Sequence, residues 1–251
     1  MKRILVVTDN GFMLNNVKLL LEEQHTELKL LFDFRRSFTS ALPKMYEEGI
    51  EELSVINVKT EWASIVRNYS LVFSIHCKQI FPPELVRGVR CVNIHPGYNP
   101  DNRGWYPQVF SIISGNVIGA TIHEMDEQID CGRIIARRQV PIHSDDTSLE
   151  VYERVLEMEM VLLKENLRAI LSNTYKPLIP EHDGIFHTKK EFEKLCQLDL
   201  NANMRLGDAI NLLRGLTHGM YANAHFTDSY GDKVFVRIQL SRILKSDKNS
   251  D

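Results

Sequence analysis

Short runs of branched apolar residues alternate with helical segments in the first part of the chain. The runs cover residues 3–7, 28–32, 71–75 and 91–94, and a helical pattern separates the first two. Apolar runs of this length, joined by helical segments, are typical of buried parallel strands with crossover helices. The pattern therefore predicts an α/β domain with a mostly parallel sheet.

Two more strands and a long helix complete the predicted core. The strands are expected over 117–125 and 134–142, after a loop at 95–104 whose Pro, Gly and Asn residues are typical of turns. Thr147 and Glu150 are spaced as a capping box, so a helix should begin there. Apolar residues then recur every three or four positions, as in an amphipathic helix. The other helices are expected over 105–114 and, as a pair, within 34–69.

A small second unit is predicted at the C-terminal end. Pro177 and Pro180 interrupt the helical pattern, and the elements beyond them are short. We therefore expect a domain over 1–180 and a small α+β domain over 181–251. The elements expected there are helices over 189–196 and 206–216 and a hairpin with strands at 221–226 and 234–240.

Composition and charge narrow the class of protein. The 251 residues include 30 basic and 33 acidic side chains, a net charge of −3 that argues against a nucleic-acid partner. No stretch is long and apolar enough to cross a membrane, and the first apolar run is too short for a signal peptide. Four scattered cysteines without a C-x-x-C pair favour reduced thiols. We expect a cytoplasmic protein without a membrane partner.

Polar residues at the strand ends are the first candidates for chemistry, because ligands of open α/β sheets bind there. Asn93 and His95 lie two residues apart on a predicted strand and therefore point to the same side. A neutral imidazole can take a proton from an attacking amine, and an amide can donate to the oxyanion that forms. Asp130, in a loop between two strands, is the candidate carboxylate that orients His95. His76, His95 and His123 show no spacing that requires a metal, so none is expected.

An ordered series of motifs surrounds these three residues. It runs Asn93-Ile-His-Pro-Gly97, Arg103-Gly104, Gly119-Ala-Thr-Ile-His123 and Asp130-Cys-Gly-Arg-Ile134. The series resembles the core signature of the formyltetrahydrofolate-dependent formyltransferases. The resemblance implies a Rossmann-like core in which Asn93, His95 and Asp130 transfer the formyl group of 10-formyltetrahydrofolate to a primary amine and release tetrahydrofolate. It also implies a folate pocket built from Ile80, Phe81, Pro82, Glu127, Gln128 and Ile129.

The loop after His95 indicates which branch of the formyltransferase family the chain resembles. It reads Gly97-Tyr-Asn-Pro-Asp-Asn-Arg-Gly-Trp-Tyr-Pro107, where the glycinamide ribonucleotide and methionyl-tRNA members typically carry Ser-Leu-Leu-Pro. With residues 74–82, 213–218 and 221–224 it is similar to the dTDP-amino-sugar N-formyltransferases. The resemblance implies a dTDP-linked 3-amino-3,6-dideoxyhexose of the quinovose or fucose type as acceptor. The product would enter surface polysaccharides such as the O-antigen of lipopolysaccharide.

A dTDP-sugar needs cations for its diphosphate and aromatic or amide groups for its base. Lys78 and Arg103 are the candidate cations, with Arg214 in reserve. The hairpin has apolar residues on both sides, which indicates that it covers another surface, and the similar subfamily implies a homodimer. The full candidate set for the acceptor is Asn10, Lys78, Gln79, Tyr98, Asn99, Arg103, Trp105, Tyr106, Tyr221 and Asn223.

Several alternatives stay open at this stage. The acceptor could be a 4-amino sugar, a UDP-linked sugar or water, the last giving a deformylase. A second class is a non-catalytic module that binds nucleotide sugars, although such a module has no need of Asn93, His95 and Asp130 together. A dinucleotide-dependent oxidoreductase is excluded, because the first strand is followed by Asp9-Asn-Gly-Phe-Met-Leu14 and not by G-x-G-x-x-G.

Overall fold

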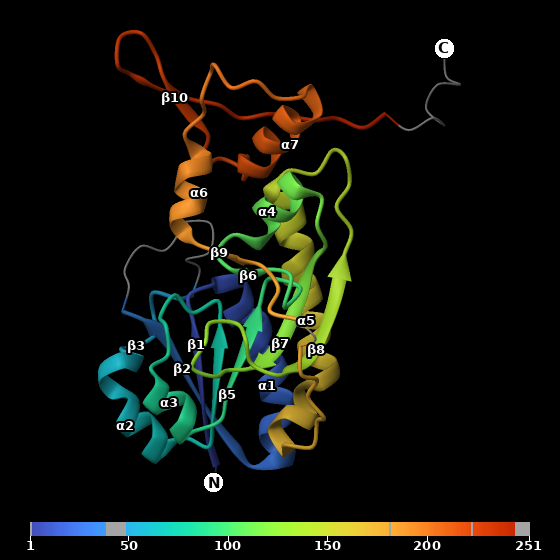
Figure 1. The fold of residues 1–251 in the computed structure, drawn as a ribbon. Helices are drawn as coiled ribbons and strands as arrows, with labels where there is room; N and C mark the ends of the chain where they lie inside the picture. The colour runs from blue at the N-terminus through green and yellow to red at the C-terminus, as the bar shows by residue number, and fades with distance from the viewer. Residues whose placement is uncertain (1, 39–48, 181, 222, 244–251) are drawn as a thin grey trace.

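The computed structural model describes residues 2–38, 49–180, 182–221 and 223–243, and its core is a seven-stranded sheet (Figure 1). The strands stand in the order β3-β2-β1-β4-β5-β7-β8. The first five in that order run parallel, and β7 runs antiparallel to both of its neighbours, β5 and β8. This confirms the predicted α/β core with a mostly parallel sheet. The strands are β1 (Lys2–Thr8), β2 (Leu30–Ser37), β3 (Val55–Ile56), β4 (Leu71–Ile75), β5 (Cys91–His95), β7 (Ile118–Glu124) and β8 (Ile134–Val140).

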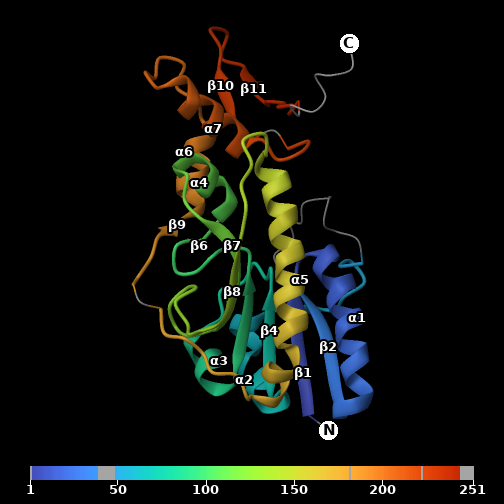
Figure 2. The same ribbon diagram turned by 90° about the vertical axis from the view of Figure 1, so that its right-hand side faces the viewer.

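Helices cover both faces of the sheet (Figure 2). On one face, α1 (Gly11–Leu28) and α5 (Ser148–Ser172) pack against Ile4 and Val6 of β1. On the other, α2 (Val58–Asn68) and α3 (Pro83–Gly88) pack against Leu5 and Val7. Alternate residues of one strand face opposite sides, so an unbroken apolar run is what a strand buried on both faces requires.

The structure corrects several expectations about the elements. The hairpin strands expected over 221–226 and 234–240 are three residues each, His225–Thr227 and Lys233–Phe235. The strand expected over 28–32 begins only at Leu30, because α1 continues to Leu28 and ends at Lys29 in the left-handed region. The segment 34–69, expected to hold two helices, contains the end of β2, then β3 and the single helix α2 among its described residues. Residues 39–48 lie outside the described part. The capping box at Thr147 and Glu150 is confirmed at the start of α5.

The strand ends meet at one edge of the sheet. Thr8 of β1 pairs with Ile75 of β4, and Ile75 in turn pairs with Ile94 of β5. The residues that follow these positions, Asp9, His76 and His95, are therefore brought to the same edge. That edge is where ligands of such sheets bind.

The C-terminal elements lie above this edge, next to α4 (Pro107–Ser114) (Figures 1 and 2). A small apolar cluster joins Val109 of α4 to Phe192, Leu216 and Ala224. The predicted division near residue 180 stays a prediction. No helix among the described residues is long and apolar enough to cross a membrane. The elements are the β6–β9 pair (Arg103–Gly104 with Phe186–His187), α6 (Lys189–Cys196), α7 (Leu206–Leu216) and the β10–β11 hairpin (His225–Thr227 with Lys233–Phe235).

Candidate active site

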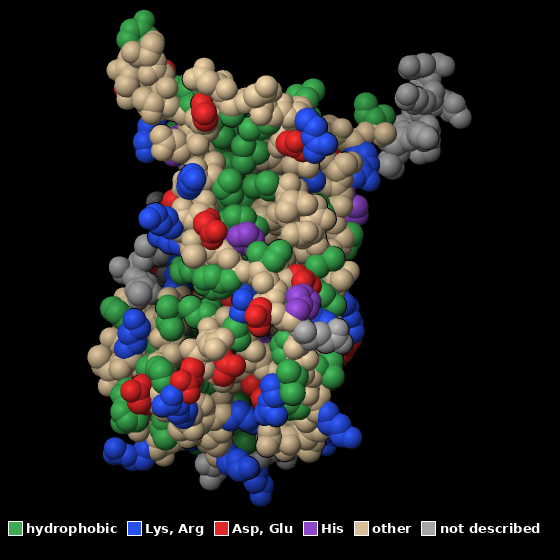
Figure 3. Space-filling model, viewed as in Figure 1, with side chains coloured by type: hydrophobic (Ala, Val, Ile, Leu, Met, Phe, Trp, Pro, Cys, Tyr) green, Lys and Arg blue, Asp and Glu red, His purple; other side chains and the backbone are tan. Residues whose placement is uncertain are grey.

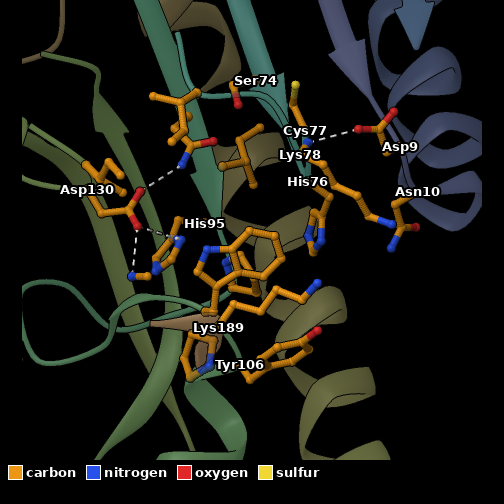
Figure 4. A pocket seen from close by; sticks show the side chains of 18 of the residues that line it. Asp9, Asn10, Ser74, His76, Cys77, Lys78, His95, Tyr106, Asp130 and Lys189 are labelled. Atoms are coloured by element: carbon orange, nitrogen blue, oxygen red, sulfur yellow. Dashed lines mark hydrogen bonds and ion pairs between the residues drawn. The ribbon is translucent and has the colours of Figure 1, made fainter. Parts of the chain in front are cut away.

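A cavity of about 740 Å³ opens at the carboxyl ends of β1, β4 and β5 (Figure 4). The sheet contributes Asn93 and His95, and the loop before β8 contributes Asp130. The opposite wall comes from the C-terminal elements, with Lys189 on α6 and Tyr221 after α7. The cavity is therefore built from both ends of the chain, and its size is in the range that binds small organic ligands.

His95 is held between a carbonyl and a carboxylate. Its Nε2 lies 2.8 Å from the carbonyl oxygen of Asn102, and its Nδ1 lies 3.7 Å from Oδ2 of Asp130. A carbonyl oxygen only accepts, so Nε2 carries a hydrogen and donates it. In the neutral ring Nδ1 is then the basic atom. A side chain at Gly97 would come within 2.5 Å of Nε2, so a glycine is needed for this approach.

Asn93 turns its amide nitrogen toward the same carboxylate. Its Nδ2 lies 3.4 Å from Oδ1 of Asp130 and 3.2 Å from Nε2 of His123. Those two atoms are only 3.5 Å apart, so the amide nitrogen lies beside both of them. An amide placed in this way can hold Asp130 and still donate to an oxygen in the cavity.

Asp130 stays ionised although it is buried. Burial opposes its negative charge, but the imidazoles of His95 and His123 and the main-chain N–H of Gly104 hold its pKa well below the usual range. Its backbone lies in the left-handed region at φ +56°, where Asn99 Nδ2 donates to its carbonyl. The carboxylate is thus fixed beside His95, where it stabilises a positive imidazole.

A second carboxylate fixes the opposite side of the cavity. Oδ1 of Asp9 accepts from the main-chain N–H of Ser37 at 2.8 Å, and Oδ2 accepts from that of Lys78 at 2.9 Å. Asp9 therefore ties β2 to the turn after β4, the turn that carries His76 and Lys78 into the cavity lining. Burial lowers the pKa of Lys78. An anionic ligand beside it would favour its charged form.

Seven of the ten candidate acceptor residues line the cavity. Gln79 is one of them, but its side chain accepts from the N–H of Val58 and donates to the carbonyl of Ile56, so it braces the wall. Burial raises the pKa of Tyr106, whose ring stacks on Phe192 of α6. The seven are Asn10, Lys78, Gln79, Trp105, Tyr106, Tyr221 and Asn223.

Three candidate acceptor residues do not lie in the cavity lining. The guanidinium of Arg103 contacts Cys131, because its backbone pairs with β9 and turns the side chain away. The ring of Tyr98 lies 4.6 Å from the guanidinium of Arg137. Asn99 is buried, and its amide braces the loop of Asp130. Arg214, the further candidate cation for the diphosphate, is also a structural residue, because it donates to the carbonyls of His143 and Asp146.

Five of the six candidate folate residues line the cavity. Ile80 and Ile129 are exposed apolar side chains there, whereas Phe81 is 5% exposed and belongs to the core. Glu127 forms an ion pair with Arg87. Pro82 caps α3 outside the lining. The five are Ile80, Phe81, Glu127, Gln128 and Ile129.

Sequence reasoning missed several lining residues. His76 is not one of them: it directly follows β4, is one of the polar strand-end residues expected near a ligand, and lines the cavity. Tyr152 and Lys189 lie on helices, where the apolar pattern gives no sign of a cavity. Within the described residues, no group of three or more His, Cys, Asp or Glu side chains could hold a metal ion. The missed residues include Gln108, Ser148, Tyr152, Lys189 and His218.

Two family models match the chain. One, described as formyl transferase, matches residues 51–167, and the other, described as N-formyltransferase dimerization C-terminal domain, matches residues 191–242. The chain is also 48% identical over 199 residues to the dTDP-4-amino-4,6-dideoxyglucose formyltransferase of Mycobacterium tuberculosis. That match covers 78% of this chain and 85% of the mycobacterial protein.

Two solved structures of N-formyltransferases are also similar to this chain. A sugar N-formyltransferase from Shewanella sp. FDAARGOS_354 superposes with a TM-score of 0.91 at 42% identity, over 97% of this chain and 100% of that one. A 4-N formyltransferase from Francisella tularensis has a TM-score of 0.89 at 39% identity, over 96% and 99% of the two chains. The similarity thus extends through the C-terminal elements as well as the core.

Proposed function

The chain belongs to the formyltransferase family, and from that premise we propose that it moves the formyl group of 10-formyltetrahydrofolate to the 4-amine of a dTDP-linked 4-amino-4,6-dideoxyhexose. The observation that carries the proposal is the pairing of His95 Nδ1 with a buried, ionised Asp130 beside Asn93, inside a cavity of about 740 Å³ at the ends of the parallel strands. The product would be a precursor of surface polysaccharides.

Two similar proteins support the 4-position of the amine. The mycobacterial and Francisella proteins, at 48% and 39% identity, both have the 4-position in their names. The resemblance of the sequence motifs favours the 3-amino sugar, with the 4-amino sugar as the alternative. We reverse that order, and the 3-amino sugar remains the competing outcome of the assay.

Residues of this chain accept the proton of the amine and stabilise the charge that develops on the formyl oxygen. As the amine nitrogen bonds to the formyl carbon, its proton passes to Nδ1 of His95, and Asp130 stabilises the resulting imidazolium. The amide of Asn93, which lies beside Asp130, donates an N–H to the oxyanion. When the oxyanion collapses, the bond to the folate nitrogen breaks and His95 returns the proton to that nitrogen.

The cavity lining suits a folate on the side of β4 and β8. Ile80 is 59% exposed and Ile129 is 42% exposed, so both offer apolar surface to a flat ring. The loop at 125–129 adds main-chain donors and acceptors along the same wall. When bound there, the folate supplies the formyl carbon. Ile80, Glu127, Gln128 and Ile129 are the residues we expect to hold it.

The other side suits a nucleotide sugar. Lys78 and Lys189 come from the core and from α6, and they are the cations we assign to the diphosphate (Figure 4). Trp105, Tyr106 and Tyr221 offer aromatic surface to the base. Arg103 has no part in this assignment, since its guanidinium contacts Cys131.

We also propose a homodimer formed through the C-terminal elements. The matched dimerization domain spans this region, and apolar side chains reach its surface (Figure 3). Leu206, Met220 and Tyr230 are 77%, 80% and 89% exposed, and Phe235 is 51% exposed. Such surface is costly to leave in water and is typical of protein interfaces.

An acceptor panel tests the proposal. The purified protein is mixed with 10-formyltetrahydrofolate and, in turn, with dTDP-4-amino, dTDP-3-amino and UDP-4-amino sugars, and the products are analysed by mass spectrometry. We expect one formyl group to be added fastest to the dTDP-4-amino sugar. Faster reaction of the 3-amino or UDP-linked sugar would overturn the acceptor, and folate deformylation without sugar product would indicate a hydrolase.

A further inference from the structure

Part of the cavity wall comes from the loop after α7, which lies above the sheet edge that carries His95 (Figures 1 and 2). This loop contributes His218, Tyr221 and Asn223 to the lining. Burial lowers the pKa of His218, which favours its neutral ring. The wall is therefore uncharged where the structure describes it, and it suits a neutral part of a ligand, such as a base, better than a diphosphate.

The amide of Asn223 has a fixed orientation in this wall. Its Nδ2 donates to the main-chain carbonyl oxygen of Leu216 at 3.0 Å. A carbonyl oxygen only accepts, so the nitrogen end of the amide faces Leu216 and Oδ1 is the other end. Among the described residues, no group donates to Oδ1. The bond to Leu216 thus leaves Oδ1 as an acceptor for a ligand in the cavity.

The main chain around Asn223 is anchored on both sides. Leu216, at the end of α7, is fully buried. Ala224 is also fully buried, and its carbonyl accepts from the main-chain N–H of Val236 at 2.8 Å. The amide is therefore held in place before a ligand binds, which lowers the entropic cost of binding.

The proposed position of the diphosphate directs the base toward this wall. In a dTDP-sugar the diphosphate separates the sugar from the nucleoside, so a sugar amine at His95 and a diphosphate at Lys189 leave the base on the far side of Lys189. Lys189 lies on α6, and Phe192 of the same helix packs with Leu216 in one apolar cluster. The loop that carries Asn223 is thus next to the helix that carries Lys189.

Thymine has a single ring N–H, at its N3 position, between two carbonyl groups. A donor of this kind needs an acceptor when it leaves water, because an unpaired buried donor is costly. Methylation of N3 removes the hydrogen and keeps the rest of the base. A site built to bond an N–H discriminates against an analogue that lacks it, since its own polar group is then left unpaired.

We propose that Asn223 is a specificity-determining residue whose Oδ1 accepts the N3–H of the base of the dTDP-sugar. This inference rests on the proposed function, which makes a dTDP-sugar the acceptor. Asn223 then selects bases with a ring N–H at this position, and its bond to Leu216 keeps the acceptor end of the amide directed to the ligand.

Calorimetric titrations with dTDP and with N3-methyl-dTDP test the inference on the full chain. The wild type should bind N3-methyl-dTDP about tenfold or more weakly than dTDP. In Asn223→Ala the acceptor is gone, so the two ligands should bind within about twofold of each other. A wild type that binds both equally, or an Asn223→Ala variant that keeps the tenfold preference, overturns the inference.

Two further variants separate the acceptor from a structural role of Asn223. Asn223→Asp cannot donate to Leu216 but keeps an acceptor oxygen, so it should keep the preference for dTDP, and its loss there would overturn the inference. Asn166→Ala is the matched control, because Nδ2 of Asn166 also donates to a carbonyl, that of Leu162, and Asn166 does not line the cavity. It should bind both ligands as the wild type does.

The outcomes distinguish this inference from the proposed function. A wild-type protein that binds no dTDP overturns both the proposed acceptor and the role of Asn223. A wild type that binds dTDP and formylates the dTDP-sugar, but does not discriminate against N3-methyl-dTDP, overturns the inference alone.

Discussion

The carbonyl of Asn102 and the carboxylate of Asp130 hold the imidazole of His95 from two sides. Because the carbonyl only accepts, it decides which ring nitrogen keeps its hydrogen and leaves Nδ1 as the base. The N–H of Met13 decides the orientation of Asn10 in the same way. At this scale the sequence predicted Asn93, His95 and Asp130 as the catalytic residues, which stays a prediction. It could not predict their reactive atoms, because those depend on main-chain groups that only the fold brings near.

Replacing Asp130 by Asn should make stability less sensitive to acid. Burial opposes ionisation, but His95 and His123 keep the pKa of Asp130 well below its usual range, so the ionised form stabilises the native state. This stabilisation is complete above about pH 4, the ordinary pKa of aspartate, and is lost as the pH falls from there toward the lowered pKa. Urea titrations between about pH 6 and pH 3 should show a steeper loss in the wild type than in Asp130→Asn. Parallel curves would contradict the assignment.

At the scale of elements, β4 was predicted residue for residue at 71–75. A parallel strand that is buried on both faces has a nearly continuous apolar sequence, and such a run predicts the bounds of the strand well. The β6–β9 pair has no such signal, since Arg103–Gly104 and Phe186–His187 are two residues each and far apart in the chain. Without that pairing, the sequence could not reveal that Arg103 turns away from the cavity.

The β6–β9 pair also supports the site. The N–H of Gly104 donates to Oδ2 of Asp130, and a Cβ at this position would lie 2.2 Å from the carbonyl oxygen of His187. Gly104→Ala should therefore separate the two strands, cost roughly 2–4 kcal/mol in the free energy of unfolding, and lower kcat. Urea unfolding and initial rates are the measurements.

Gly115→Ala is the matched control for this prediction. Gly115 also has a positive φ, of +73°, but a Cβ there would meet no atom within 4 Å. Gly115→Ala should lower the free energy of unfolding only by the backbone strain, about 1–2 kcal/mol, and should leave kcat unchanged. Equal effects of the two substitutions on stability and rate would show that β9 does not support Asp130.

At the scale of the whole molecule, the two ends of the chain enclose one cavity. His95 and Asp130 come from the core, whereas Lys189, His218 and Tyr221 come from the C-terminal elements. Sequence patterns predicted the elements of both parts, but Tyr221 entered the candidate set only through resemblance. Contacts between α4 and α7 join segments far apart in the chain, which periodicity cannot report.

The proposed dimer gives a prediction at this scale. Phe235→Glu places a charge on the exposed face of the hairpin, where Phe235 is 51% exposed. Light scattering should give about twice the chain mass of 29.0 kDa for the wild type and the single-chain mass for this variant. Leu19→Glu, on the surface of α1 where Leu19 is 64% exposed, is the control and should leave the mass unchanged. A wild-type monomer, or a dimer unaffected by Phe235→Glu, would contradict an interface at the hairpin.

The most direct measurement compares formyl transfer by the wild type and by His95→Asn. Both are assayed with saturating 10-formyltetrahydrofolate and dTDP-4-amino-4,6-dideoxyglucose, and the formylated sugar is counted by mass spectrometry. Asparagine keeps a polar group at this position but cannot take the amine proton at neutral pH. We expect the wild type to form the product and the variant to be slower by a factor of about 100 or more. A variant of near-normal rate, or a wild type without product, would contradict the central claim that His95 is the base of a sugar N-formyltransferase.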